Sequence, residues 1–229
     1  MKIEKTIGSL LISGSILVLI PYTILTVIFD YPAILRQETG IILTKFHEGG
    51  APLIWTWWAF ALVGLPLLGA YTLLGQKLES RFSWVRLATF IGIFGLVVQM
   101  IGLLRWPLVV PILAQQFIDG DPATQAAAKI AFQVIHQYGG VGLGEHLGQL
   151  FTIAWTVMMT AAFAKTALFP KWLIGLGYVS SGIYFMAQAE LVATVLPSFP
   201  YWDLAGFLGS TLWLVWLIAL GIRILRVKL

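Results

Sequence analysis

The chain has 229 residues, of which 59% are hydrophobic and only 10% are charged, and its formal net charge is +4. Soluble domains carry about 25% charged residues, so this composition excludes an ordinary soluble globular domain and indicates an integral membrane protein. The absence of cysteine excludes disulfides, thiolate metal sites and thiol catalysis. Most basic residues lie in short segments between apolar runs, so they are interpreted as topology signals, and nucleic acid is excluded as a partner.

Six apolar runs are long enough to cross most or all of a hydrocarbon core roughly 30 Å thick. Backbone polar groups cannot stay unpaired in lipid, so each run is predicted to be a helix. The predicted spans are Ile7–Phe29, Leu53–Leu74, Ala88–Leu104, Gly140–Phe163, Trp172–Val192 and Leu204–Ile222. The first run is longer than the apolar region of a signal peptide and is expected to be retained. The fold class is therefore all-α, a six-helix transmembrane bundle, with residues 1–229 forming a single integral membrane domain.

Lysine and arginine are distributed unevenly between alternate connections. Only Arg36, Lys45, Arg105 and Lys129 fall on one side, and the remaining ten of the 14 lie on the side of the two termini. Cytoplasmic loops carry the excess of such residues, so both termini are predicted to be cytoplasmic.

The two long connections on the other side are predicted to contain amphipathic helical segments. One is residues 30–52 and the other residues 105–139. Pro107 and Pro111 are expected to kink or end the third span. Asp121 is predicted to cap a new helix with Pro122 in its first turn, a helix that either continues into the fourth span or breaks at Gly139-Gly140.

Polar residues of three spans are predicted to share one layer near the outer interface. At about 1.5 Å per residue, Arg105, His146 and Glu190 all lie roughly 25–29 Å from the inner end of their spans. Ionisable groups inside a bilayer usually face a bundle interior or a watery cavity, so a convergent pocket is the hypothesis. Further side chains assigned to it are Glu145, Gln149, Gln188, Tyr184 and the deeper Gln99.

Glycines mark the fourth span. Gly140, Gly144 and Gly148 recur every four residues, a small-residue stripe that lets another helix approach closely. This stripe is interpreted either as packing within the bundle or as the face of a homo-oligomer. His146 points to nearly the opposite side, where Gly142 leaves room for a flat or bulky group.

Three functional hypotheses follow for this layer, and whether the protein is an enzyme stays open. In the first, the site holds zinc or haem, with His146 as a ligand, His136 or His47 as a second ligand, and Glu145 or Glu190 beside them. Gly142 would make room for the cofactor. The competing interpretation of His146 and Glu145 is an interfacial pair that ties helices together.

In the second hypothesis, the protein binds or carries a small or lipidic molecule without a metal. Arg105 and Glu190 would contact the substrate, together with Gln99, Gln149, Gln188 and Tyr184. The competing interpretation of Arg105 is a side chain that extends to the outer interface beside Trp106. In the third hypothesis, the protein is a structural or partner protein of the bilayer.

Two segments carry a resemblance to a known family. The stretch LFPKWLIGLGYVSSG, residues 168–182, and the preceding GGVGLGEHLGQLFTIAWTVMM are similar to bacterial six-span membrane proteins catalogued as a domain of unknown function. The resemblance covers the C-terminal half of the chain. It implies a six-helix bundle in the bacterial cytoplasmic membrane, and it implies no activity and no functional residue.

Overall fold

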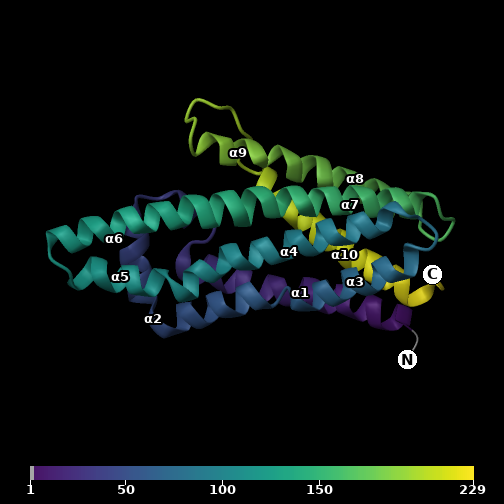
Figure 1. Ribbon diagram of the computed structural model, residues 1–229, viewed down its shortest axis with the longest axis horizontal. Helices are drawn as coiled ribbons and strands as arrows, with labels where there is room; N and C mark the ends of the chain where they lie inside the picture. Colours follow the sequence, from purple (N-terminus) through teal and green to yellow (C-terminus); the bar gives the residue numbers. More distant parts are fainter. Residues whose placement is uncertain (1–2) are drawn as a thin grey trace. The chain divides into compact units, whose positions relative to one another are not determined.

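The computed structural model describes residues 3–229, and within that range it contains helices and loops but no strand (Figure 1). Lys2, one of the residues in the topology count, lies outside the described range. The helices are α1 Ile3–Phe29, η1 Ala33–Arg36, α2 Thr39–Leu62, α3 Leu65–Leu78, α4 Trp84–Leu108, α5 Val110–Asp119, α6 Pro122–Ile135, η2 His136–Leu147, α7 Gly148–Ala164, α8 Lys171–Met186, α9 Gln188–Ala193 and α10 Ala205–Arg226. The predicted all-α class is confirmed.

Five helical runs within residues 3–229 are long and apolar enough to cross a membrane. They are Ile3–Phe29, Thr39–Leu78, Trp84–Asp119, Pro122–Ala164 and Ala205–Arg226. The predicted span Trp172–Val192 is not among them, and in the structure it is divided into α8, with 16 residues, and α9, with six. The division falls at Ala187, where i to i+3 hydrogen bonds from Ala187 to Tyr184 and from Glu190 to Ala187 tighten the chain.

Prolines and caps set the ends of several helices. As predicted, α4 ends at Leu108, directly after Pro107, and α5 begins at Val110 with Pro111 in its first turn. The predicted cap of α6 is also confirmed, since an Asp121 carboxylate oxygen accepts a hydrogen bond from the Thr124 backbone N–H at 2.8 Å.

The connection after α1 is helical for most of its length. The Glu38 carboxylate caps α2 by accepting hydrogen bonds from the N–H groups of Gly40 and Ile41. Gly50, with φ +53°, bends α2 where an L-residue with a side chain would be strained. The predicted span Leu53–Leu74 is interrupted and not continuous. Helix α2 ends at Leu62, and α3 begins at Leu65 with Pro66 in its first turn.

A long π-helix, η2, follows α6 without interruption and continues directly into α7. The chain therefore does not break at Gly139-Gly140. π-Helical geometry is rare and usually limited to a single turn, often at functional sites. Here it extends over 12 residues, of which Gly139, Gly140, Gly142 and Gly144 are glycine.

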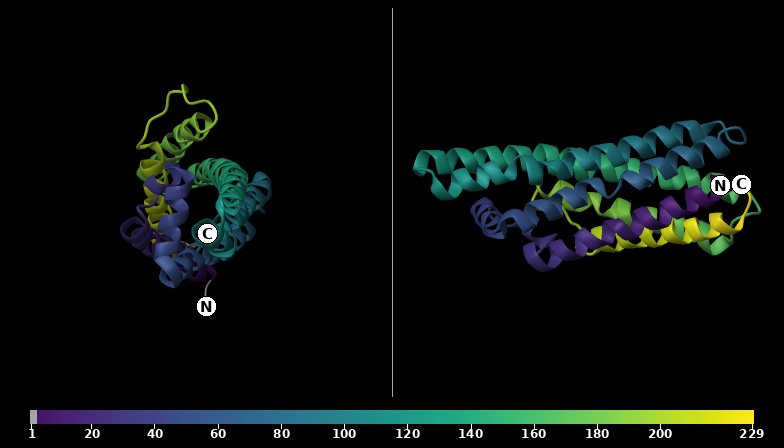
Figure 2. Two further views of the ribbon diagram at one scale, coloured as in Figure 1. Left: turned by 90° about the vertical axis from the view of Figure 1, so that its left-hand side faces the viewer. Right: turned by 90° about the horizontal axis from the view of Figure 1, so that it is seen from below.

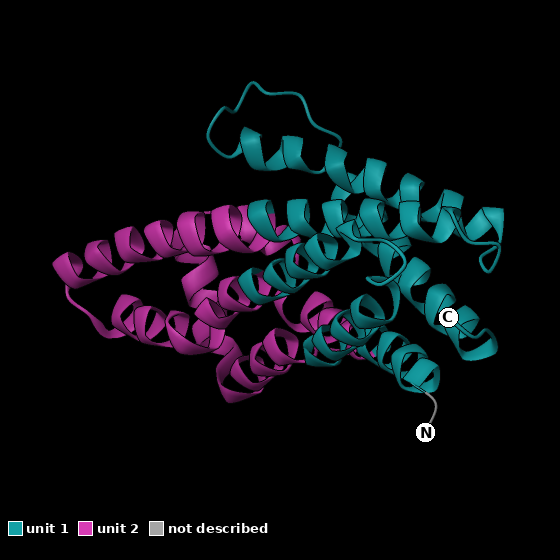
Figure 3. Cartoon of the chain, turned by 45° about the vertical axis from the view of Figure 1, so that its right-hand side comes forward, with its two compact units in different colours: residues 1–16, 64–98, 146–229 teal, residues 17–63, 99–145 magenta. Residues whose placement is uncertain are grey.

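The chain contains two compact units, coloured separately in Figure 3. Unit 1 comprises residues 1–16, 64–98 and 146–229, and unit 2 comprises residues 17–63 and 99–145. Helices α1 and α4 each contribute to both units, so neither unit is a contiguous segment. The prediction of a single domain over residues 1–229 stays a prediction.

In unit 1, α1 and α10 run antiparallel, so that the start of α1 and the end of α10 lie at the same end of that unit (Figure 2). A Cβ on Gly8 would lie 2.7 Å from the Gly221 carbonyl oxygen, so glycine is required for this approach. Two buried tryptophans hold α10 by hydrogen bonds from their indole N–H, from Trp213 to Thr156 Oγ1 and from Trp216 to the Leu173 carbonyl, both at 3.1 Å.

Unit 2 has an aromatic core. The rings of Trp57 and Trp106 stack with centroids 4.7 Å apart, and Phe29 meets both rings edge-on. Phe46 stacks on Trp106 from another direction. Aromatic pairs of this kind add about 0.5–1.5 kcal/mol each beyond the area they bury. This core fixes the end of α4, where Trp106 is preceded by Arg105.

Candidate functional site

Arg105 lies inside unit 2, with only 6% of its surface exposed. The guanidinium lies 5.1 Å from the centroid of the Trp106 ring. Nη1 donates to the Gly102 carbonyl one turn earlier, and Nη2 lies 3.5 Å from Nδ1 of His136. The side chain therefore points into the protein, and the alternative that it extends to the interface is wrong.

His136, the first residue of η2, is the second buried member of the site. Its ring stacks on Phe132 with centroids 5.2 Å apart and is 8% exposed. Arginine has no acceptor atom, so Nδ1 of His136 must accept the hydrogen bond from Arg105, and the ring proton then resides on Nε2. Nε of Arg105 is buried and has no hydrogen-bond partner within residues 3–229, whereas the backbone of Leu35 lies close enough to His136 to interact with its ring.

Glu145, near the end of η2, supplies the nearest negative charge. Its carboxylate forms an ion pair with Arg36, with Nη2 of Arg36 2.9 Å from Oε2 of Glu145. Arg105 interacts with Glu145 only through longer-range electrostatics. Within the described residues no acidic side chain forms an ion pair with Arg105.

The glycines of η2 make room for this cluster. A Cβ on Gly140 would lie 2.9 Å from Nε of Arg105, so the guanidinium packs directly against the backbone. A Cβ on Gly102 would lie 2.6 Å from the Cα of Gly144, so α4 and η2 touch backbone to backbone. In unit 1, the Gly148 carbonyl oxygen packs against Gly95 in the same way. The predicted stripe thus packs against α4, and its role in a homo-oligomer stays a prediction.

A second polar group lies in unit 1. His146 Nδ1 is 2.7 Å from Oε1 of Gln188, and Gln188 Nε2 donates to Oε1 of Gln149 at 2.6 Å. The predicted convergence of His146, Gln188 and Gln149 is therefore present. His146 itself is exposed, whereas Gln188 is buried.

Other predicted residues of unit 1 face α10. Tyr184 packs against Gly209, and a Cβ on Gly206 would lie 3.9 Å from Oε2 of Glu190. Gln99, which belongs to unit 2, is half-buried on α4. Tyr184, Glu190 and Gln99 all form interactions with other parts of the protein.

The three histidines do not form the predicted metal site. His47 is exposed on α2, His136 is hydrogen-bonded to Arg105, and His146 is hydrogen-bonded to Gln188. Over residues 3–229, no group of three or more His, Asp or Glu residues is arranged to hold a metal ion. Neither zinc nor a doubly ligated haem is supported by this arrangement.

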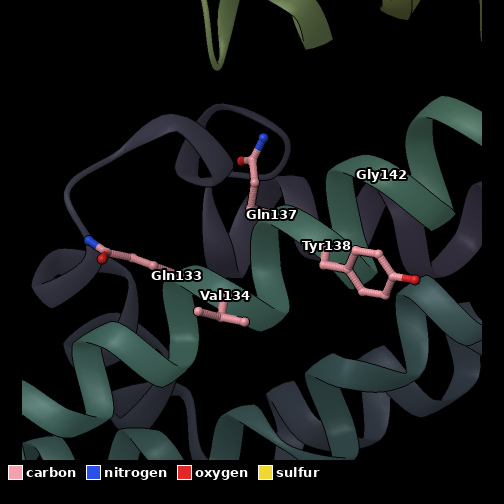
Figure 4. A pocket seen from close by; sticks show the side chains of 5 residues that line it. All are labelled: Gln133, Val134, Gln137, Tyr138 and Gly142. Atoms are coloured by element: carbon pink, nitrogen blue, oxygen red, sulfur yellow. The ribbon is translucent and has the colours of Figure 1, made fainter.

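Gly142 lines a shallow hollow on the surface of α6 and η2 (Figure 4). Gln133, Val134, Gln137 and Tyr138 are its other lining residues. A Cβ on Gly142 would contact only the Gln137 carbonyl oxygen, at 3.5 Å, so the expected free space at Gly142 is present. No charged side chain lines the hollow, and His146 is not part of it.

Sequence reasoning missed Arg36, Gly102 and the stacking partner Phe132. The available signal was the spacing of Gly102 and Arg105, which places the glycine carbonyl one helical turn before the guanidinium. The pairing of Arg105 with His136, 31 residues later in the chain, has no signal in the sequence.

Five helical runs of the described chain that are long and apolar enough to cross a bilayer indicate a helical membrane protein. The chain belongs to the family described as Domain of unknown function (DUF4386), whose model matches residues 6–221. The match extends the resemblance from the C-terminal half to nearly the whole chain. No curated protein and no solved structure matches the chain.

Proposed function

We propose that this protein binds or carries a small amphiphilic molecule with an acidic group, without a metal, and that Arg105 contacts the acidic group. The observation that carries the proposal is the buried guanidinium of Arg105, which forms no ion pair with an acidic side chain in residues 3–229. Its Nε–H is also buried and has no partner there.

The free-energy cost of burying an unpaired charge favours a bound anion over a purely structural role. A buried charge is strongly disfavoured unless it is paired and hydrogen-bonded. The two acceptors that Arg105 does have, the Gly102 carbonyl and His136, are both neutral, so they leave its charge uncompensated. Ionisable groups in membrane helices commonly mark the path or site of a substrate or ion. A carboxylate or phosphate would accept the remaining guanidinium protons in the geometry that arginine recognises best.

The surroundings support an amphiphile rather than a fully polar ion. Trp106, Phe132 and Trp57 form the wall beside Arg105 and His136, and all three are almost completely buried. The bilayer supplies the solvent for the apolar part of such a ligand. The metal or haem hypothesis has no comparable support, because the described residues contain no group of three or more His, Asp or Glu side chains that could hold a metal ion.

The test uses octanoate as the probe. Wild-type protein and Arg105→Gln are purified in a neutral detergent, and binding of radiolabelled octanoate is measured, with octanol as the uncharged competitor. The wild type is expected to bind octanoate, to resist competition by octanol, and to bind at least tenfold more tightly than Arg105→Gln. Arg86→Gln, which removes an exposed arginine paired with Glu79, is the matched control and should bind normally. Equal binding by Arg105→Gln and wild type would overturn the proposal.

We also propose six spans in the bacterial cytoplasmic membrane with both termini cytoplasmic. The sixth span is α8 together with α9, which continue each other on either side of Ala187. The excess of Lys and Arg on the side of the termini and the antiparallel packing of α1 against α10 support the orientation. A reporter enzyme that is active only in the cytoplasm should be active when fused to either terminus. If a C-terminal fusion were active only with a reporter that works on the opposite side of the membrane, six spans would be contradicted.

A further inference from the structure

We infer that the site takes up one proton together with each carboxylate, and that His136 accepts the proton. This inference rests on the proposed function and specifies its ligand as a monovalent carboxylate amphiphile. It starts from the contact between Arg105 and His136, which is the only interaction of the imidazole nitrogens with a side chain in the described part of the chain.

In the structure without ligand, Arg105 and His136 are hydrogen-bonded to each other. Nη2 of Arg105 is the donor and Nδ1 of His136 is the acceptor, at 3.5 Å. The neutral imidazole therefore accepts a guanidinium hydrogen bond that a bound anion would otherwise accept. An incoming carboxylate has to displace this acceptor before it can bind Nη2.

Protonation of His136 reverses the role of Nδ1. A protonated imidazole donates from both nitrogens, so Nδ1–H and Nη2–H would face each other as two donors. Two like-charged donors repel, and the repulsion is relieved when an anion lies between them. The two oxygens of one carboxylate can each accept one of these protons, which gives charge-assisted hydrogen bonds on both sides.

The charged groups around His136 come from three elements. Arg105 of α4 and Arg36 of η1 are the cations that act on it, and Glu145 of η2 is the anion that acts on Arg105. Glu145 is already held by Arg36 at 2.9 Å. The phenol of Tyr31 also acts on Arg105. A bound carboxylate would supply a negative charge directly beside a protonated His136.

Charge balance favours the coupled reaction in a low-dielectric site. Binding of one proton and one monoanion leaves the net charge of the site unchanged, whereas binding of the proton alone would add a buried positive charge. One proton balances one negative charge, which is why the inferred ligand is a carboxylate and not a doubly charged phosphate.

The experiment measures proton uptake as octanoate binds. In weakly buffered detergent solution at a pH where His136 is neutral without ligand, a pH indicator should report about one proton taken up per octanoate bound. The affinity for octanoate should fall roughly tenfold for each unit that the pH rises over that range, as linkage to a single proton requires. His136→Gln, which keeps a hydrogen-bonding side chain but cannot titrate, should bind with no proton uptake and with an affinity independent of pH. His146→Gln is the matched control and should keep both effects.

The possible outcomes separate this inference from the proposed function. Octanoate binding that depends on Arg105 but releases or takes up no proton overturns the inference alone. Proton uptake that persists in a folded His136→Gln protein also overturns it, since another group then accepts the proton. Absence of octanoate binding to the wild type overturns both. The measurement on the wild type remains decisive even where His136→Gln does not fold.

Discussion

Gly102 of α4 and Gly144 of η2 lie in backbone contact, so close that a Cβ on Gly102 would be 2.6 Å from the Cα of Gly144. The contact places the π-helix directly against the last turns of α4, where Arg105 projects toward His136. Two glycines 42 positions apart therefore determine how closely the two sides of the proposed site approach.

The first prediction concerns this contact. Gly102→Ala should destabilise the protein by about 1–3 kcal/mol, because the added methyl group can fit only if one backbone shifts. Gly142→Ala is the matched control in η2. Its Cβ would have no contact shorter than 3.5 Å, so stability should be unchanged or slightly higher. Thermal unfolding in detergent measures both, and equal melting temperatures for the two variants would contradict the close contact.

The second prediction compares two fully buried tryptophans of unit 1. The indole N–H of Trp216 donates to the Leu173 carbonyl, whereas that of Trp155 has no partner within residues 3–229. Both substitutions to Phe remove similar volume, but only Trp216→Phe removes a hydrogen bond. Trp216→Phe should therefore be less stable than Trp155→Phe by about 1 kcal/mol in unfolding experiments. The reverse order would show that the hydrogen bond at Trp216 does not stabilise α10.

The third prediction concerns stability at low pH. The hydrogen bond from Lys129 and then the N–H of Gly40 hold the pKa of Glu38 below its usual value. A carboxylate with a lowered pKa in the folded state stabilises the protein above its unfolded pKa of about 4.3, and that contribution disappears as the pH falls through the folded pKa. The melting temperature of the wild type should therefore fall more steeply in acid than that of Glu38→Gln. Parallel curves for the two proteins would mean that Glu38 contributes nothing to acid sensitivity.

The fourth prediction separates binding from stability at Arg105. Glu145 remains paired with Arg36 when Arg105 is removed, so Arg105→Met leaves no carboxylate uncompensated. Replacing a buried charge by an apolar side chain of similar size is often neutral or stabilising. The melting temperature should be equal to or above that of the wild type, while octanoate binding is lost. If Arg105 instead completed a structural ion pair, the same substitution would cost about 3–5 kcal/mol.

The secondary structure was largely predictable because its signals are local. Apolar runs located five of the spans, and the proline positions together with Asp121 located the ends of α4, α5 and α6. The interruption at Ala187 carries no comparable signal, whereas Gly64 and Pro66 do mark the one at Val63. The π-helical geometry of η2 was equally hidden, since its glycines are also compatible with an ordinary α-helix.

The candidate site was only partly predictable for a different reason. Depth along each helix correctly grouped His146 with Gln188 and Gln149, because the rise per residue is fixed. Depth does not specify which way a side chain points, so histidines predicted at similar depth do not need to meet. The pairing of Arg105 with His136 depends on the approach of α4 to η2, a tertiary contact that depth alone does not predict.

Helix α1, helix α4 and the helical run from α6 to α7 are each divided between the two compact units. This division restricts which segments can be exchanged between relatives by recombination. Replacing unit 2 by the equivalent segments of a relative requires four junctions, at 16/17, 63/64, 98/99 and 145/146. Three of these fall inside a continuous helix, where the donor and recipient must agree in register. A single recombination event cannot transfer either unit intact, so the two are expected to be inherited together.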